Sequence, residues 1–175
     1  MHHAGRLAII AAFVSYLSAC QTVSPQPKLT GVGMTGVDYL ADHLSVQDYW
    51  VNGRAGFQAG KGGSNVCCAS VPETWYPGAQ IEVRWEVDNW RKATWRCYRR
   101  MVPLDRYDTL GHLYVQFLPD GQVRAVLSDY VPWSINFPGT RLPIPKKEPW
   151  NQFPASASAS APTDQCPENQ ETSDE

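Results

Sequence analysis

The chain has 175 residues, of which 43% are hydrophobic and 18% charged, and its formal net charge is -2. Once the two ends described below are set aside, roughly 130 residues remain, enough for one domain with its own core. Residues 20–153 hold 14 basic and 12 acidic side chains, which is not the strongly basic balance of nucleic-acid-binding proteins. We therefore expect no nucleic-acid partner.

The N-terminal segment has the pattern of a secretion signal. Residues 7–16 are uncharged and mostly apolar, and they follow Arg6. This run is shorter than the about 20 apolar residues that cross a bilayer, but it suits the core of a signal peptide. The next four residues, LSAC at 17–20, resemble the lipobox of bacterial lipoproteins. That resemblance implies cleavage after residue 19 and acylation of Cys20. Gln21 follows instead of an aspartate, so we expect an outer-membrane anchor with the protein facing the periplasm.

Four segments are expected along the chain. They are a signal peptide (1–19), a lipidated N-terminus and spacer (20–28), a β-rich periplasmic domain (29–153) and a C-terminal tail (154–175). The spacer contains two prolines and polar residues, as extended linkers do. The tail begins with alternating Ala and Ser and continues with acidic residues, so we expect it to be disordered.

Short strands are expected throughout the middle of the chain, over 44–51, 66–71, 80–87, 93–102, 113–117 and 123–127. The clearest is 80–87, where four apolar residues alternate with polar ones at the period of a half-buried strand. Pro119-Asp120-Gly121 predicts a turn between the last two strands. No window has a helical period. The predicted fold class is all-β, an antiparallel sandwich or open barrel with long loops. The proline-rich segment after Asp129 is expected to be irregular and to wrap the sheet.

Cysteines other than Cys20 are disulfide candidates, because the periplasm permits disulfides. Alternation places Cys67 and Cys97 on inward faces, so the favoured pair is Cys67–Cys97. Cys68 would point the other way and could then reach Cys166 in the tail. A bond between the adjacent Cys67 and Cys68 is an alternative, and so is a single bonded pair with the other cysteines free. Without a CxxC motif, a zinc site is not expected.

Recognised catalytic motifs are missing from the sequence. The two histidines left after cleavage, His43 and His112, have no metal-binding spacing, and there is no GxSxG elbow. We expect neither an enzyme nor a cofactor. Two features are candidates for binding a partner instead. One is the glycine-rich stretch 53–65, which does not match a phosphate-binding loop but could form a long recognition loop; its candidate residues are Gly60, Gly62 and Gly63.

The other candidate is a basic stretch with interleaved aromatic residues, at 90–106. Its chosen residues are Arg91, Arg96, Tyr98 and Arg100. They could meet an acidic partner or lipid headgroups. Alternatively, they form a solvated strand face on which arginine stems cover aromatic surface.

The sequence NVCCASVP at 65–72, followed by WYPG at 75–78, resembles the core of a family of bacterial lipoproteins that contain a domain of unknown function. LYVQFLPDG at 113–121 matches a later segment, and the resemblance covers about residues 29 to 145. Members often accompany phospholipase effectors of the type VI secretion system, and some are immunity lipoproteins that inhibit the cognate lipase. The resemblance implies that role here, with a secreted phospholipase as the protein partner. A structural or assembly lipoprotein of the envelope is the alternative, and an enzyme acting on envelope polymers is the least favoured hypothesis.

Overall fold

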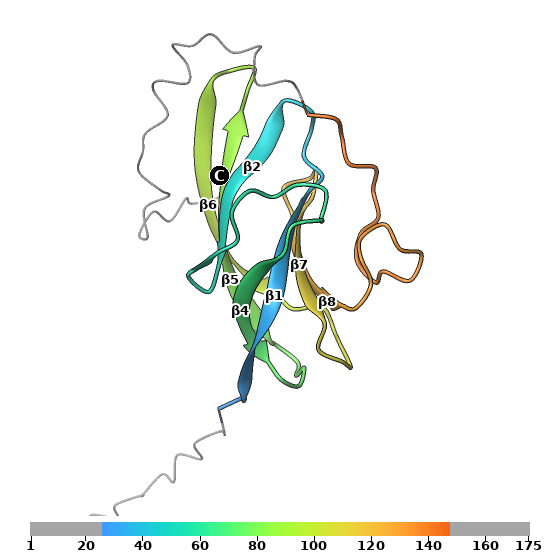
Figure 1. Cartoon of the computed structure of the whole chain (residues 1–175). Coiled ribbons are helices and arrows are strands. Elements are labelled where there is room, and N and C mark those ends of the chain that lie inside the picture. The colour runs from blue at the N-terminus through green and yellow to red at the C-terminus, as the bar shows by residue number, and fades with distance from the viewer. Residues whose placement is uncertain (1–25, 148–175) are drawn as a thin grey trace, which may run out of the picture.

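Eight strands form the regular structure of residues 26–147, the part of the chain that this computed structural model describes (Figure 1). They are β1 (Leu29–Asp38), β2 (Leu44–Val51), β3 (Arg54–Ala55), β4 (Val66–Pro72), β5 (Gln80–Asn89), β6 (Thr94–Pro103), β7 (His112–Phe117) and β8 (Val123–Ser128). The first sheet has the order β4-β1-β7-β8 and the second sheet has the order β3-β2-β5-β6. The predicted all-β class is confirmed, and the two sheets do not close into a barrel. Residues 26–147 include no helix with the length and apolar character needed to cross a membrane.

The core lies between the two sheets and follows from alternation. Ile81, Val83 and Trp85 of β5 are at most 4% exposed, and they belong to one cluster with Val115 and Phe117 of β7. The Trp85 and Phe117 ring centroids are 5.8 Å apart. Burying each such side chain is worth roughly 1.5–3 kcal/mol. The apolar face of β5 therefore fixes which side of the second sheet meets the first.

Each of the six predicted strands is present, and two further strands were not predicted. The missed strand β1 lies in the middle of the first sheet, antiparallel to β4 and parallel to β7, with Met34 opposite Leu113. Its glycines obscure the strand pattern, since glycine lowers β propensity. They are needed for space: a Cβ on Gly36 would lie 2.7 Å from Cε1 of Tyr49, and one on Gly33 would lie 2.8 Å from Nδ1 of His112.

The inward face of β6 was predicted wrongly. Tyr98 pairs with Trp85 across the ladder and stacks on it with ring centroids 5.2 Å apart, so Tyr98 is on the core side. Trp95 and Cys97 are on the outer face, where Cys97 packs against Trp50. Large side chains occupy both sets of alternate positions in β6, so the sequence of the strand does not show which set faces the core. The register with β5 determines it, as hairpin registers generally do.

Several predictions cannot be placed in the fold. The signal peptide, Cys20, part of the spacer, and the tail with Cys166 lie outside the described residues. The expected irregular segment after Asp129 is present, and it runs along the outer face of the first sheet (Figure 1). We call residues 129–147 the strap.

Candidate protein-binding surface

The basic residues predicted as a binding cluster do not gather on one surface. Arg91 contacts Asp42, with Nη2 3.0 Å from Oδ2, at the end of the β5–β6 hairpin. Arg100 donates to the carbonyl of Gly121 at 3.1 Å and lies over the Trp85 ring. Arg96 is exposed at the mouth of a small cleft of about 280 Å³ that Tyr98 also lines. These side chains therefore have separate neighbours: Arg91 lies in the turn before β6, while Arg96 and Arg100 lie on the same face of that strand as Tyr98.

The glycine-rich loop crosses the top of β1 and is fixed there by its backbone. The amide of Gly60 donates to the carbonyl of Gly36 at 3.1 Å, and its carbonyl accepts from the amide of Asp38 at 2.9 Å. Gly62 is buried with φ of 86°, and a Cβ there would lie 3.0 Å from Cγ of Pro132. Gly63 is exposed. Gly60 thus joins the loop to β1 through its backbone hydrogen bonds, and Gly62 packs the loop against the strap.

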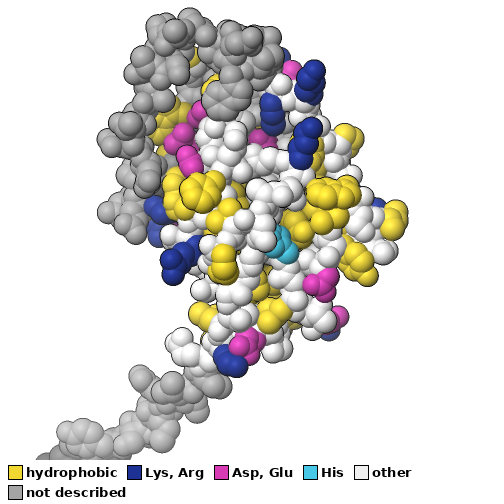
Figure 2. All heavy atoms as spheres, viewed as in Figure 1, with side chains coloured by type: hydrophobic (Ala, Val, Ile, Leu, Met, Phe, Trp, Pro, Cys, Tyr) yellow, Lys and Arg dark blue, Asp and Glu magenta, His cyan; other side chains and the backbone are white. Residues whose placement is uncertain are grey.

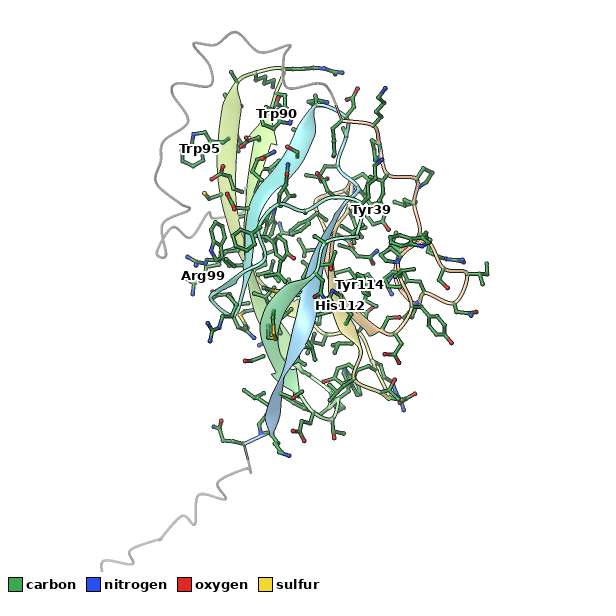
Figure 3. The ribbon with its side chains drawn as sticks, viewed as in Figure 1. Tyr39, Trp90, Trp95, Arg99, His112 and Tyr114 are labelled. Atoms are coloured by element: carbon green, nitrogen blue, oxygen red, sulfur yellow. A yellow bond between two sulfur atoms is a disulfide. The ribbon has the colours of Figure 1, made fainter. Side chains whose placement is uncertain are left out.

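The end of the same loop is attached to the first sheet through a buried threonine. The Thr35 hydroxyl contacts the carbonyl of Ser64 and lies 2.6 Å from Nε2 of His112. Burial lowers the pKa of His112. Figure 3 places His112 beside Tyr114 on the strap side of the molecule, well away from Trp90 and Trp95 of the β5–β6 hairpin.

The favoured disulfide Cys67–Cys97 is wrong. Cys67 is bonded to Cys68, as the alternative had it. The reason is a bulge in β4: Val32 pairs with Ala69 but Met34 pairs with Val66, so β4 carries one extra residue at the two cysteines. A bulge interrupts the strict alternation on which the prediction relied. Cys67 is consequently exposed, while Cys97 is on the outer face of the second sheet.

The strap is held on the first sheet by a side-chain clamp at Thr140. Gln116, which is fully buried, donates from Nε2 to the Thr140 carbonyl at 2.7 Å and accepts from the Thr140 amide at 2.9 Å. Tyr39 donates its hydroxyl to the same carbonyl at 2.8 Å. Phe137 is buried against Tyr114 with ring centroids 5.3 Å apart. The strap therefore has a defined path, although it contains no strand.

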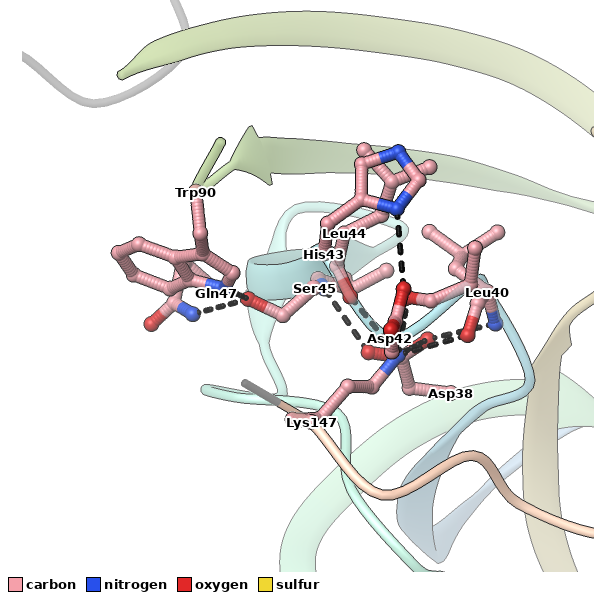
Figure 4. A network of polar contacts seen from close by, with 11 residues as sticks. Asp38, Leu40, Asp42, His43, Leu44, Ser45, Gln47, Trp90 and Lys147 are labelled. Carbon is pink, nitrogen blue, oxygen red and sulfur yellow. Dashed lines mark hydrogen bonds and ion pairs between the residues drawn. The ribbon is translucent and has the colours of Figure 1, made fainter. Parts of the chain in front are cut away.

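A second attachment lies at Lys147, the last described residue (Figure 4). Its Nζ is 3.0 Å from Oδ1 of Asp38, and it donates to the carbonyls of Leu40 at 2.9 Å and Leu44 at 2.8 Å. Asp38 is 1% exposed and also accepts from the amides of Leu40 and Val46. Burial raises the pKa of Asp38, and the nearby ammonium partly offsets this effect.

Large apolar side chains point outward from the strap despite its fixed backbone. Trp133 is 67% exposed and Ile135 is 78% exposed, and Tyr130 and Leu142 are also exposed. In Figure 2, hydrophobic side chains gather over the strap at the right of the view. A cleft of about 710 Å³ lies between the strap and the glycine-rich loop, lined among others by Lys61, Trp133, Arg141 and Leu142. Clustered exposed apolar residues of this kind mark interaction sites.

The sequence did not single out this surface. Its residues lie in a segment without periodicity, where an apolar side chain has no strand or helix to dictate its burial. One signal was available: Trp133, Ile135 and Leu142 lie among prolines and polar residues, where a solvated loop would not need large apolar side chains.

Acidic side chains form a patch on the outer face of the second sheet. Asp48 and Glu86 are cross-strand partners, and Asp88 is two residues further along β5. Burial, followed by Asp88 and Asp48, raises the pKa of Glu86 to about 7. No group of His, Cys, Asp and Glu side chains within residues 26–147 is arranged to hold a metal ion.

Together these features define a two-sheet β-sandwich with exposed apolar side chains on an ordered strap. Residues 39–125 match the model of a family described as "Protein of unknown function (DUF3304)". No curated protein and no solved structure matches the chain.

Proposed function

We propose that this protein is a non-catalytic immunity lipoprotein that binds and inhibits a cognate secreted phospholipase at the periplasmic face of the outer membrane. The observation that carries the binding role is the strap, where Trp133 and Ile135 are exposed although the backbone beside them is fixed through Thr140. The class of partner comes from the resemblance of residues 65–78 and 113–121 to lipase-associated lipoproteins.

The chemistry of inhibition agrees with such a surface. An inhibitor needs no nucleophile or metal; it needs a well-packed surface that keeps substrate from the enzyme. Tryptophan, tyrosine and arginine contribute most to such interfaces, and the strap presents Tyr130, Trp133 and Arg141. A lipid on Cys20 would confine the inhibitor to the membrane that the enzyme attacks and would raise its effective concentration there.

Co-expression tests the proposal. A secreted phospholipase from the same genome, chosen because its gene adjoins that of this protein, is directed to the periplasm with and without the full-length chain, and cell survival and phospholipid release are measured. We expect the chain to restore growth and to suppress lipid hydrolysis. Undiminished toxicity would contradict the immunity role, and an envelope defect on deletion, in cells without any lipase, would support the alternative of an assembly lipoprotein.

The anchor is tested separately. Cys20→Ala removes the thiol that would carry the lipid, so this variant should leave the membrane fraction and appear in the soluble periplasmic fraction. Retention of the variant in the membrane fraction would contradict the lipobox prediction.

A further inference from the structure

The cleft beside the strap is lined by two basic side chains. Lys61 comes from the glycine-rich loop and Arg141 from the strap, and both line the cleft. Neither makes an ion pair with another residue of the 26–147 range. No acidic side chain lines the cleft among those residues. The cleft therefore combines two available cations with the apolar walls of Trp133 and Leu142.

We propose that this cleft receives an acidic segment of the partner protein that also carries a large apolar side chain. The inference rests on the proposed function, and it specifies the site at which the partner docks and the chemical groups that bind it. Carboxylates of the segment would meet Lys61 and Arg141, and its apolar side chain would pack on Trp133. Arginine pairs with a carboxylate in a bidentate arrangement that lysine cannot match, so Arg141 fixes the orientation of the segment.

Preorganisation of the strap favours this docking site over the other exposed surfaces. Amides of Ser134 and Phe137 donate to the carbonyls of Val131 and Ser134, at 2.9 and 3.2 Å, which folds the strap tightly beside Trp133. Gln116 fixes Thr140, the residue before Arg141. Little conformational entropy is then lost when a partner binds, and such anchors give the largest share of interface energy.

The shape of the site favours a protein segment over a membrane surface. The cleft is open to solvent, and its volume of about 710 Å³ falls within the range of roughly 300–1,000 Å³ that is usual for ligand sites. A flat bilayer would contact the protruding side chains but would not fill the concave space between Lys61 and Arg141. We therefore assign the cleft to a segment of a partner protein, and the experiment below distinguishes this from lipid binding.

The test uses the purified full mature chain and the purified phospholipase encoded beside its gene. Dissociation constants are measured by titration calorimetry, at low and at high salt, for the wild type and for Trp133→Ser, Arg141→Glu and Lys61→Glu. Two variants are matched controls: Arg54→Glu reverses an exposed cation on β3, and Met101→Ser removes an exposed apolar side chain on the outer face of β6. All five positions are exposed, so the melting temperature should stay at the wild-type value. Ile135→Ser provides an independent strap variant.

We expect each cleft variant to weaken binding at least about tenfold, and the controls to bind like the wild type. The salt dependence of the wild type should largely disappear in Arg141→Glu. If the wild-type chain does not bind the lipase, the proposed function fails. If it binds and the cleft variants bind equally well, the docking site is wrong while the proposed function stands. Binding of an unacylated Cys20→Ser chain to phosphatidylglycerol vesicles, abolished by Trp133→Ser, would assign the cleft to lipid and overturn the inference.

Discussion

Lys147 should be one of the most sensitive positions for stability, because it neutralises a carboxylate that has almost no access to water. Replacing it with methionine keeps most of the apolar stem but leaves Asp38, 1% exposed, without its counter-ion. Breaking a buried pair by removing one partner costs about 3–5 kcal/mol. The Lys147 side chain is 27% exposed, and Asp38 keeps the amides of Leu40 and Val46. Both facts reduce the cost, so we expect Lys147→Met to lower the free energy of unfolding by about 2 kcal/mol.

This loss should depend on pH in a defined direction. Burial already raises the pKa of Asp38, and Lys147 is among the groups that lower it. The variant should therefore have a still higher Asp38 pKa in the folded state. Folded protein then holds a proton that the unfolded chain has released, so stability falls as pH rises above about 4. The cost of Lys147→Met is consequently largest at pH 7 and decreases towards pH 4, where Asp38 is neutral.

Urea unfolding followed by tryptophan fluorescence at pH 4, 5.5 and 7 measures these differences. Lys146→Met is the matched control, because Lys146 is the exposed neighbour and makes no ion pair among the described residues. In an Asp38→Asn background the cost of Lys147→Met should be smaller, since no charge is left to neutralise. A cost equal to that of Lys146→Met, or a cost that does not change with pH, would refute the reasoning.

Three further predictions concern positions in the two sheets. Gln116→Leu should cost about 2–3 kcal/mol, because the Thr140 amide loses its partner and the Thr140 carbonyl keeps only the Tyr39 hydroxyl; hydrogen exchange at Thr140 should accelerate, and unchanged protection would contradict the clamp. Gly36→Ala should cost about 1–3 kcal/mol through overpacking, since the added Cβ would lie 2.6 Å from Cβ of Ala59 and 2.7 Å from Cε1 of Tyr49. Gly60→Ala, where a Cβ meets nothing within 4 Å, should leave the melting temperature unchanged. Glu86→Gln should raise the free energy of unfolding at pH 8 by about 1 kcal/mol, after allowance for solvent screening. The reason is that the raised pKa of Glu86 makes the wild type lose stability as the pH rises from 4.5 to about 7. Equal effects at pH 4.5 and pH 8 would argue against a protonated Glu86.

The sequence predicted the strands whose alternation is regular, and these form most of both sheets. Ile81, Val83 and Trp85 alternate with charged residues, so their inward face could be read directly. The central strand β1 was missed because Gly33 and Gly36 replace side chains where His112 and Tyr49 need room. That requirement comes from residues distant in sequence, and no local pattern contains it.

Two other errors have the same origin in tertiary structure. The bulge of β4 lies at Cys67 and Cys68 and depends on the register with β1. The inward face of β6 depends on its pairing with β5, because Tyr98 and Trp95 are equally suited to packing until Trp85 selects Tyr98. The candidate surface was missed for a different reason: the strap has no periodicity, and contacts with distant residues such as Gln116, Tyr114 and Asp38 fix its path.

The parallel pairing of β1 with β7 also governs when this chain can fold. Met34 pairs with Val66 on one side and with Leu113 on the other, so the first sheet cannot be completed until nearly the whole domain is available. The chain loses conformational entropy when it closes such a long loop, before the strand contacts that offset this loss have formed. Folding is therefore slow, in the range of milliseconds to seconds for sheet proteins of high contact order. Any N-terminal fragment that ends before β7 has an open edge on β1. The last strands of the domain are therefore needed to cover the edge of its first strand, so the first sheet is complete only once β7 has been synthesised.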